Sequence, residues 1–81
     1  MHTSTSPDRL IYMANQIGTF FNSQGQAKAV PGIAEHIHKF WDPRMRKALL
    51  AKLDAGEPDI NEIVQQAVRE HRARLEAGIP A

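Results

Sequence analysis

The chain contains no cysteine among its 81 residues. Disulfide bonds, thiolate metal sites and thiol redox chemistry are therefore excluded. Long hydrophobic runs are also absent, since no apolar stretch approaches the ~20 residues that a membrane-spanning helix requires. The opening residues, MHTSTSPDR, lack the cationic region followed by an apolar region that marks a secretory signal peptide. These absences predict a cytoplasmic protein that does not enter a membrane.

An excess of charge of one sign is absent as well. Ten Lys and Arg residues stand against nine Asp and Glu residues, which gives a formal net charge of +1. Proteins dedicated to nucleic acids usually carry a basic excess, so this balance argues against that class. The sequence also lacks a glycine-rich phosphate loop and a nucleophile elbow, and 81 residues leave little room for a deep pocket. We expect no catalytic residue, and no cofactor or metal ion bound by this chain.

Apolar residues recur at helical spacing in four segments, and no segment alternates with the period of a strand. The first segment extends from Ser6-Pro7 to Gly25, and the second from residue 30 to residue 41. The third extends from Asp42-Pro43 to Gly56, and the fourth from Asp59 to Gly78. The second helix is not expected to begin earlier, because Pro31 is tolerated only in a first turn. The sequence predicts an all-α fold, a small bundle or orthogonal array of four short amphipathic helices. It predicts one helical domain over 6–78, between a disordered N-terminal tail (1–5) and a C-terminal tail (79–81).

Histidines raise the question of a metal site in residues 36–47, HIHKFWDPRMRK. His36 and His38 are two positions apart, so on a helix they point in nearly opposite directions and cannot hold one ion. Zinc also needs further ligands, which no cysteine supplies. We interpret both as helix-surface or interface histidines. His71 falls within the apolar stripe of the fourth helix and is interpreted as a core histidine, with a contact to a partner as the alternative.

The same segment is rich in basic and aromatic side chains. One interpretation is a solvated helix face, balanced by the acidic residues that follow it. The other is a surface that binds a protein partner, with Trp41 either an exposed anchor or part of the core. The partner-binding residues would be Lys39, Phe40, Trp41, Arg44, Arg46, Lys47 and His36. A helix-turn-helix that binds nucleic acid through the basic third helix is the alternative, although that helix has no Asn or Gln to read bases.

Three blocks are more specific than a generic helix pattern. They are IYMANQIG followed by FF, GIAEHI, and KFWDPRMR, within residues 11–21, 32–37 and 39–46. In order and spacing they resemble the delta subunit family of NAD-dependent formate dehydrogenases. The resemblance extends from about residue 9 to about residue 68.

The resemblance implies a non-catalytic accessory subunit of a cytoplasmic, molybdenum-containing formate dehydrogenase. It implies a complex in which the alpha subunit holds bis-molybdopterin guanine dinucleotide and iron–sulfur clusters, while beta and gamma subunits carry FMN and further clusters. The delta subunit would bind the alpha subunit and support assembly, stability or activity of the holoenzyme. A homodimer of the isolated chain is a second hypothesis, because Met13, Ala14 and Gly18 would let another helix approach closely, from this chain or a second copy.

Overall fold

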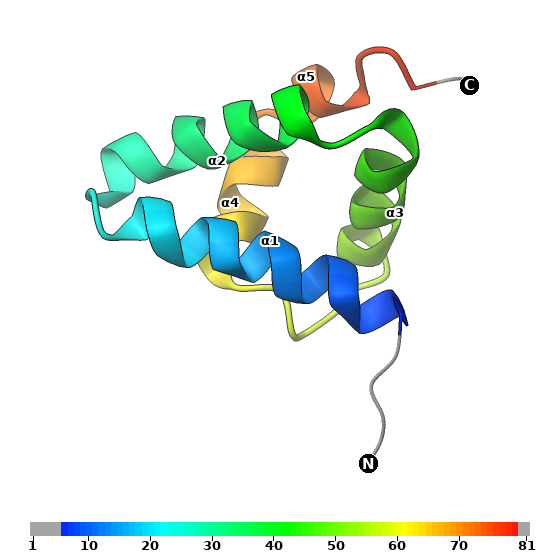
Figure 1. Ribbon diagram of the computed structural model, residues 1–81, viewed down its shortest axis with the longest axis horizontal. Helices are drawn as coiled ribbons and strands as arrows, with labels where there is room; N and C mark the ends of the chain where they lie inside the picture. Colours follow the sequence, from blue (N-terminus) through cyan, green and yellow to red (C-terminus); the bar gives the residue numbers. More distant parts are fainter. Residues whose placement is uncertain (1–5, 80–81) are drawn as a thin grey trace.

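The computed structural model describes the backbone of residues 6–79 and the side chains of residues 9–79. Every regular element in this range is an α-helix (Figure 1). The helices are α1 (Ser6–Asn22), α2 (Gln26–Phe40), α3 (Pro43–Asp54), α4 (Glu62–Glu70) and α5 (Arg72–Glu76). The predicted all-α fold class is confirmed. The predicted N-terminal tail and the last two residues of the predicted C-terminal tail lie outside the described residues.

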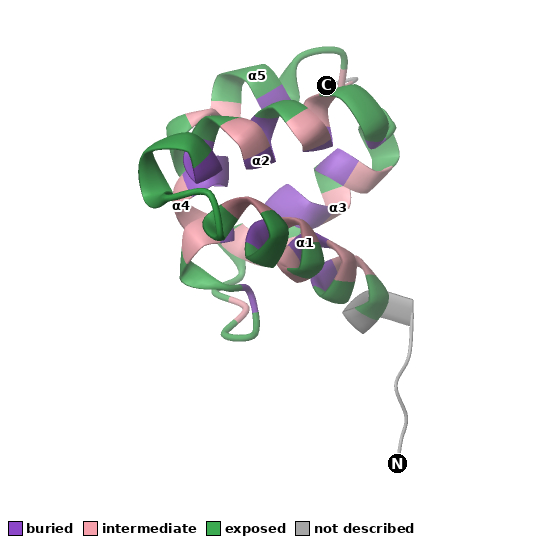
Figure 2. Ribbon diagram, turned by 60° about the vertical axis from the view of Figure 1, so that its left-hand side comes forward, coloured by how far each residue is buried: buried purple, intermediate pink, exposed green. Residues whose placement is uncertain are grey.

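Helix α2 lies at the centre of the packing, because it contacts α1, α4 and α5. Helix α3 stands across the open end between α1 and α2, where it contacts α1 and α5 (Figure 1). Buried segments of the helices face inward and exposed segments lie on the outside (Figure 2). Among the described residues, none of the helices combines the length and the apolar composition needed to cross a bilayer.

The start of α2 differs from the prediction. The helix begins at Gln26 rather than near residue 30, so Pro31 lies inside it and not in its first turn. Gly25 adopts a φ of 97°, which a glycine tolerates, and its carbonyl accepts the first hydrogen bonds of the helix. Ala29 is completely buried between these two positions. The helix therefore contains in its interior a proline that cannot donate a backbone hydrogen bond.

The fourth predicted segment forms two helices instead of one. His71 has φ −117° and ψ 28°, which interrupts the helix between α4 and α5. Its N–H still donates to the carbonyl of Ala67, and its own carbonyl accepts from the N–H of Leu75. His71 is half-buried at this break, while Leu75 packs into the core beyond it.

Asn15 fixes the loop that precedes α4. Its Nδ2 donates to the carbonyl of Asp59 at 2.9 Å, and its Oδ1 accepts from the N–H of Asn61 at 2.9 Å. The loop thereby stays non-helical and places Ile60 in the core. For this reason α4 begins at Glu62 and not at the predicted Asp59.

Helices α1 and α4 approach one another closely at Gly18. A Cβ atom at this position would lie 2.6 Å from Val64 Cγ2 and 3.2 Å from Ile63 Cγ2. Both distances are shorter than ordinary van der Waals contact, so glycine is needed for this packing. The helix that approaches Gly18 belongs to the same chain.

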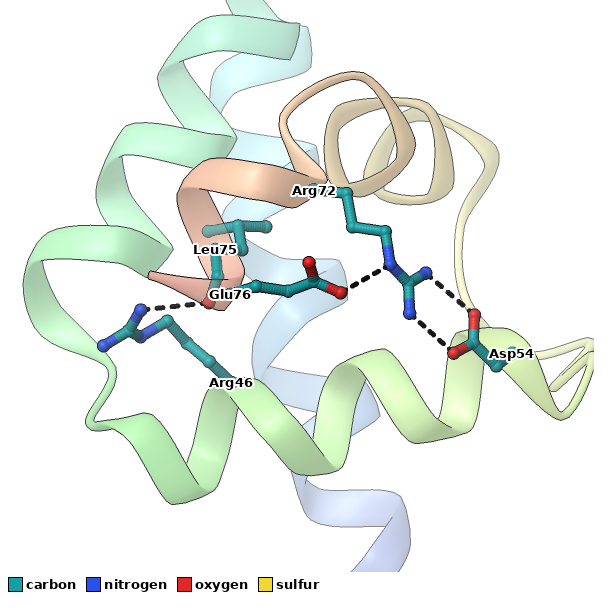
Figure 3. Close-up of polar contacts among 5 residues, drawn as sticks. All are labelled: Arg46, Asp54, Arg72, Leu75 and Glu76. Carbon is teal, nitrogen blue, oxygen red and sulfur yellow. Dashed lines mark hydrogen bonds and ion pairs between the residues drawn. The ribbon is translucent and has the colours of Figure 1, made fainter. Parts of the chain in front are cut away.

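Arg72 ties α3 to α5 (Figure 3). Its Nη1 and Nη2 donate to the two carboxylate oxygens of Asp54 at 2.8 and 2.7 Å, and its Nε donates to Glu76 at 2.9 Å. The hydrogen bonds from Arg72, with its positive charge, hold the pKa of Asp54 below its usual value. The same contacts raise the pKa of Arg72.

We predict that Gly18→Ala lowers the free energy of unfolding by about 1 kcal/mol. Alanine favours a helix by about 1 kcal/mol over glycine, but overpacking a core costs about 1–3 kcal/mol. Val64 is β-branched and stiff, so its methyl group cannot rotate away easily. Urea denaturation measures the change, and in a Val64→Ala background the same substitution should lose its destabilising effect. A more stable Gly18→Ala single variant would contradict the close approach.

The Asp54–Arg72 pair predicts a pH dependence of stability. Because the pKa of Asp54 is lower in the folded state than its usual 3.8, its stabilising contribution is complete above that value. The contribution is lost as the pH falls through the folded pKa. Thermal unfolding at neutral and strongly acidic pH should show a smaller loss of Tm for Asp54→Asn than for the wild type. The exposed Asp59→Asn is the control, and an equal loss in Asp54→Asn and the wild type would contradict the linkage.

Candidate functional site

Metal-ligating side chains are not clustered in the described part of the chain, where no group of three His, Asp or Glu residues could hold an ion. His36 lies between two aromatic rings, with centroid distances of 6.1 Å to Phe21 and 4.8 Å to Phe40. His38 has a buried Nδ1 without a hydrogen-bond partner. The two histidines therefore occupy different environments.

The structure divides the seven residues predicted to bind a partner into a surface group and a core group. The surface group comprises exposed Lys39, Phe40, Arg44 and Lys47, and half-buried His36; the core group comprises Trp41 and Arg46. Trp41 is 5% exposed and joins the hydrophobic core at the turn between α2 and α3. Only the surface group can meet a partner without opening the fold.

Arg46 is held inside the molecule by backbone carbonyls (Figure 3). Its Nη1 donates to Leu75 at 3.0 Å and to Ala77 at 2.8 Å, and its Nε donates to Trp41 at 3.2 Å. Carbonyls at a helix C-terminus carry partial negative charge, so the end of α5 compensates the guanidinium without a carboxylate. Arg46 thus joins the end of α2, the first turn of α3 and the end of α5.

Three basic side chains, Lys39, Arg44 and Lys47, form what we call the cationic corner. Lys39 Nζ lies 3.7 Å from Glu35 Oε2, whereas Arg44 and Lys47 make no ion pair with any described residue. Residues 43–53 of α3 contain no acidic residue. The flanking acids are both engaged, since Asp42 accepts from the N–H of Met45 and Asp54 binds Arg72. The corner therefore has positive charge available for an outside carboxylate.

An aromatic row consists of Phe20, Phe21, His36 and Phe40, and its last member directly follows Lys39 of the corner in the sequence. The Phe20 and Phe21 centroids lie 5.1 Å apart, and the contacts of His36 with Phe21 and Phe40 complete the row. Phe20 is 62% exposed and Phe40 is 71% exposed. The ring of Phe21 lies over Gly32, where a Cβ would be 2.7 Å from Phe21 Cδ1.

Sequence reasoning identified His36 and Phe40 but missed the α1 half of the row. Phe20 and Phe21 both fitted the apolar stripe of the first helix. Consecutive helical residues point about 100° apart, so the two rings lie at different places on the stripe. The adjacent pair was a signal that the two rings would differ in exposure.

The nucleic-acid alternative gains no support from this arrangement. Trp41 in the turn is buried, and Arg46 is directed to α5, which leaves Arg44 and Lys47 as the exposed cations of α3. Side chains that read base edges, Asn and Gln, do not occur on this helix.

We predict that Arg46→Met lowers the free energy of unfolding by about 2 kcal/mol, because hydrogen bonds to charged groups contribute about 1.5–3 kcal/mol. Arg44→Met is the matched control on the same helix, and its exposed site should change stability by about 0.5 kcal/mol or less. Chemical denaturation of both variants measures the difference. Equal stabilities would show that the carbonyl contacts of Arg46 contribute nothing.

Comparison with known families gives a match over residues 9–68. The matching model describes the NADH-dependent formate dehydrogenase delta subunit FdsD. The matched range includes the aromatic row, the cationic corner and Arg46, and it ends before α5. Searches of curated proteins and of solved structures found no match. Because the match covers most of the chain, including the blocks quoted from its sequence, the chain belongs to the family of NADH-dependent formate dehydrogenase delta subunits.

Proposed function

We propose that this chain is a non-catalytic accessory subunit of a cytoplasmic, NAD-dependent, molybdenum-containing formate dehydrogenase. It binds the alpha subunit of an alpha–beta–gamma complex and supports assembly, stability or activity of the holoenzyme. Membership of the delta subunit family over residues 9–68 is the observation that carries this proposal. Bis-molybdopterin guanine dinucleotide, iron–sulfur clusters and FMN belong to the partner subunits in this proposal, and the chain itself binds none of them.

The groove between α1, α2 and α4 has no catalytic set of side chains. It has a volume of about 420 Å³ and lies between α1, the start of α2 and the start of α4. Its lining contains one titratable side chain, Glu62, among neutral residues. General acid–base catalysis requires a positioned acid or base with a suitable pKa, usually assisted by neighbouring charged groups. The groove does not supply such a set.

The cationic corner supports binding to an acidic surface. Arg44 and Lys47 are exposed and have no ion-pair partner among the described residues, so a carboxylate of another subunit can approach them without displacing an existing bond. Complementary charge accelerates association and selects the partner. A subunit that binds the assembled enzyme preferentially also stabilises it, by about 2.7 kcal/mol at a concentration of about one hundred times Kd.

We predict that Arg44→Glu combined with Lys47→Glu weakens binding to the formate dehydrogenase complex about tenfold or more, because like charges then face one another. The tagged chain is co-expressed with the alpha, beta and gamma subunits, and the captured alpha subunit is quantified. Lys28→Glu combined with Arg74→Glu is the control, since it changes the net charge equally at two other exposed sites.

We expect the wild type and the control to capture the alpha subunit, and the variant with Arg44→Glu and Lys47→Glu to lose this capture. Failure of the wild-type chain to capture any formate dehydrogenase subunit would contradict the proposed function. Equal capture by all three proteins would remove the cationic corner from the interface.

A further inference from the structure

We infer that the aromatic row is the centre of the docking surface, and that its occupant is an apolar segment of another formate dehydrogenase subunit. That segment bears carboxylates at the end that meets the cationic corner. The inference rests on the proposed function and specifies the chemistry of the partner's contact segment.

The exposure of the row indicates a surface that another chain covers. Phe20 and Phe40 are two of the three large hydrophobic side chains that are exposed in the described residues. Ring contacts through Phe21 and His36 join them into one continuous surface. Contiguous apolar surface of this kind marks interaction sites, whereas single exposed apolar residues do not.

The middle of the row is packed against the fold before any partner arrives. Phe21 is half-buried and lies against the backbone of α2 at Gly32, which fixes its ring. His36 lies between Phe21 and Phe40 and links the two helices. Side chains that are already packed, as Phe21 and His36 are, lose little conformational entropy on binding.

Charge is missing from the α1 side of the row. Residues 10–27 contain no charged residue, in a chain that is 23% charged overall. The centres of protein interfaces are depleted in charge and enriched in aromatic residues. The part of the partner that covers Phe20 should therefore be apolar and uncharged.

At its other end, Phe40, the row has positive charge close to it along the chain. Lys39 directly follows His38 and precedes Phe40, and Arg44 lies in the first turn of α3. A symmetric dimer that buries the row against the same stretch of a second copy is poorly suited to this end, because residues 9–40 contain a single acid, Glu35, which already pairs with Lys39. Charge complementarity therefore favours a different chain, with its own carboxylates, over such a homodimer.

The experiment compares Phe20→Ser and Phe40→Ser with Tyr12→Ser in the chain co-expressed with the alpha, beta and gamma subunits. Tyr12 is the comparison, because it is 62% exposed like Phe20, lies on the same helix and lines the same shallow groove, but has no part in the ring contacts of the row. We expect both phenylalanine variants to bind the complex about tenfold more weakly or worse, since exposed aromatic anchors dominate interface energetics. Tyr12→Ser should bind like the wild type. Circular dichroism of the three variants verifies that their helices are retained.

Salt dependence separates the two halves of the surface. The phenylalanine variants should lose affinity at every salt concentration and keep the salt dependence of the wild type. Arg44→Ala combined with Lys47→Ala should instead flatten that dependence, because rim charges act through long-range attraction.

Three results would overturn the inference. If the wild type captures the alpha subunit and both phenylalanine variants capture it equally well, the aromatic row is not the docking surface, while the proposed function stands. Equal loss in Tyr12→Ser would place the contact on the outer face of α1 instead of the row. Sedimentation equilibrium showing a dimer that Phe20→Ser dissociates, with complex formation unchanged, would identify a second copy as the occupant. If the wild type captures no subunit, the proposed function itself fails.

Discussion

The buried guanidinium of Arg46 is the interaction on which the rest of the surface depends. It binds the carbonyl that ends α2 and the two carbonyls that end α5, so it fixes the turn into α3 from both sides. Residues two apart on a helix point in nearly opposite directions. Because Arg46 is directed inward, Arg44 is directed outward. Of these two positive charges of α3, that of Arg46 stabilises the fold and that of Arg44 is exposed to solvent.

The turn between α2 and α3 brings the two parts of the proposed docking surface together. Phe40 ends α2 and the aromatic row, Trp41 anchors the turn in the core, and Asp42 caps α3 by accepting from the N–H of Met45 at 2.9 Å. The cationic corner begins within a few residues of the end of the row. A partner that covers the exposed rings would therefore find unpaired cations at one end, which is the arrangement expected of an apolar centre with a charged rim.

Local sequence patterns were sufficient for the fold class and for several helix ends. The period of apolar residues identified the helical segments, and Asp42-Pro43 marked the start of α3 correctly. Features that depend on distant residues were not predictable in this way. Arg46 is buried by carbonyls about thirty positions further along the chain, and Asn15 sets the start of α4 from α1. Helix α2 begins at Gln26 and has Pro31 in its interior, which the local rule for proline did not predict.

The candidate site was predictable only in part, because it too depends on contacts between distant residues. Composition indicated a basic and aromatic segment but could not divide it between surface and core. The division required knowing that α5 covers Arg46 and that Gly32 provides space for Phe21. Phe21, the second of two adjacent phenylalanines, packs against α2 at Gly32. Phe20 is left exposed and so becomes part of the candidate site.

Binding of this chain to the catalytic complex can be measured by calorimetry, with the purified chain titrated into an alpha–beta–gamma formate dehydrogenase prepared without it. If the chain is an accessory subunit, we expect saturable binding that weakens as salt is added, because unpaired cations contribute to the contact. No detectable heat or complex at low salt, with both proteins folded, would contradict it.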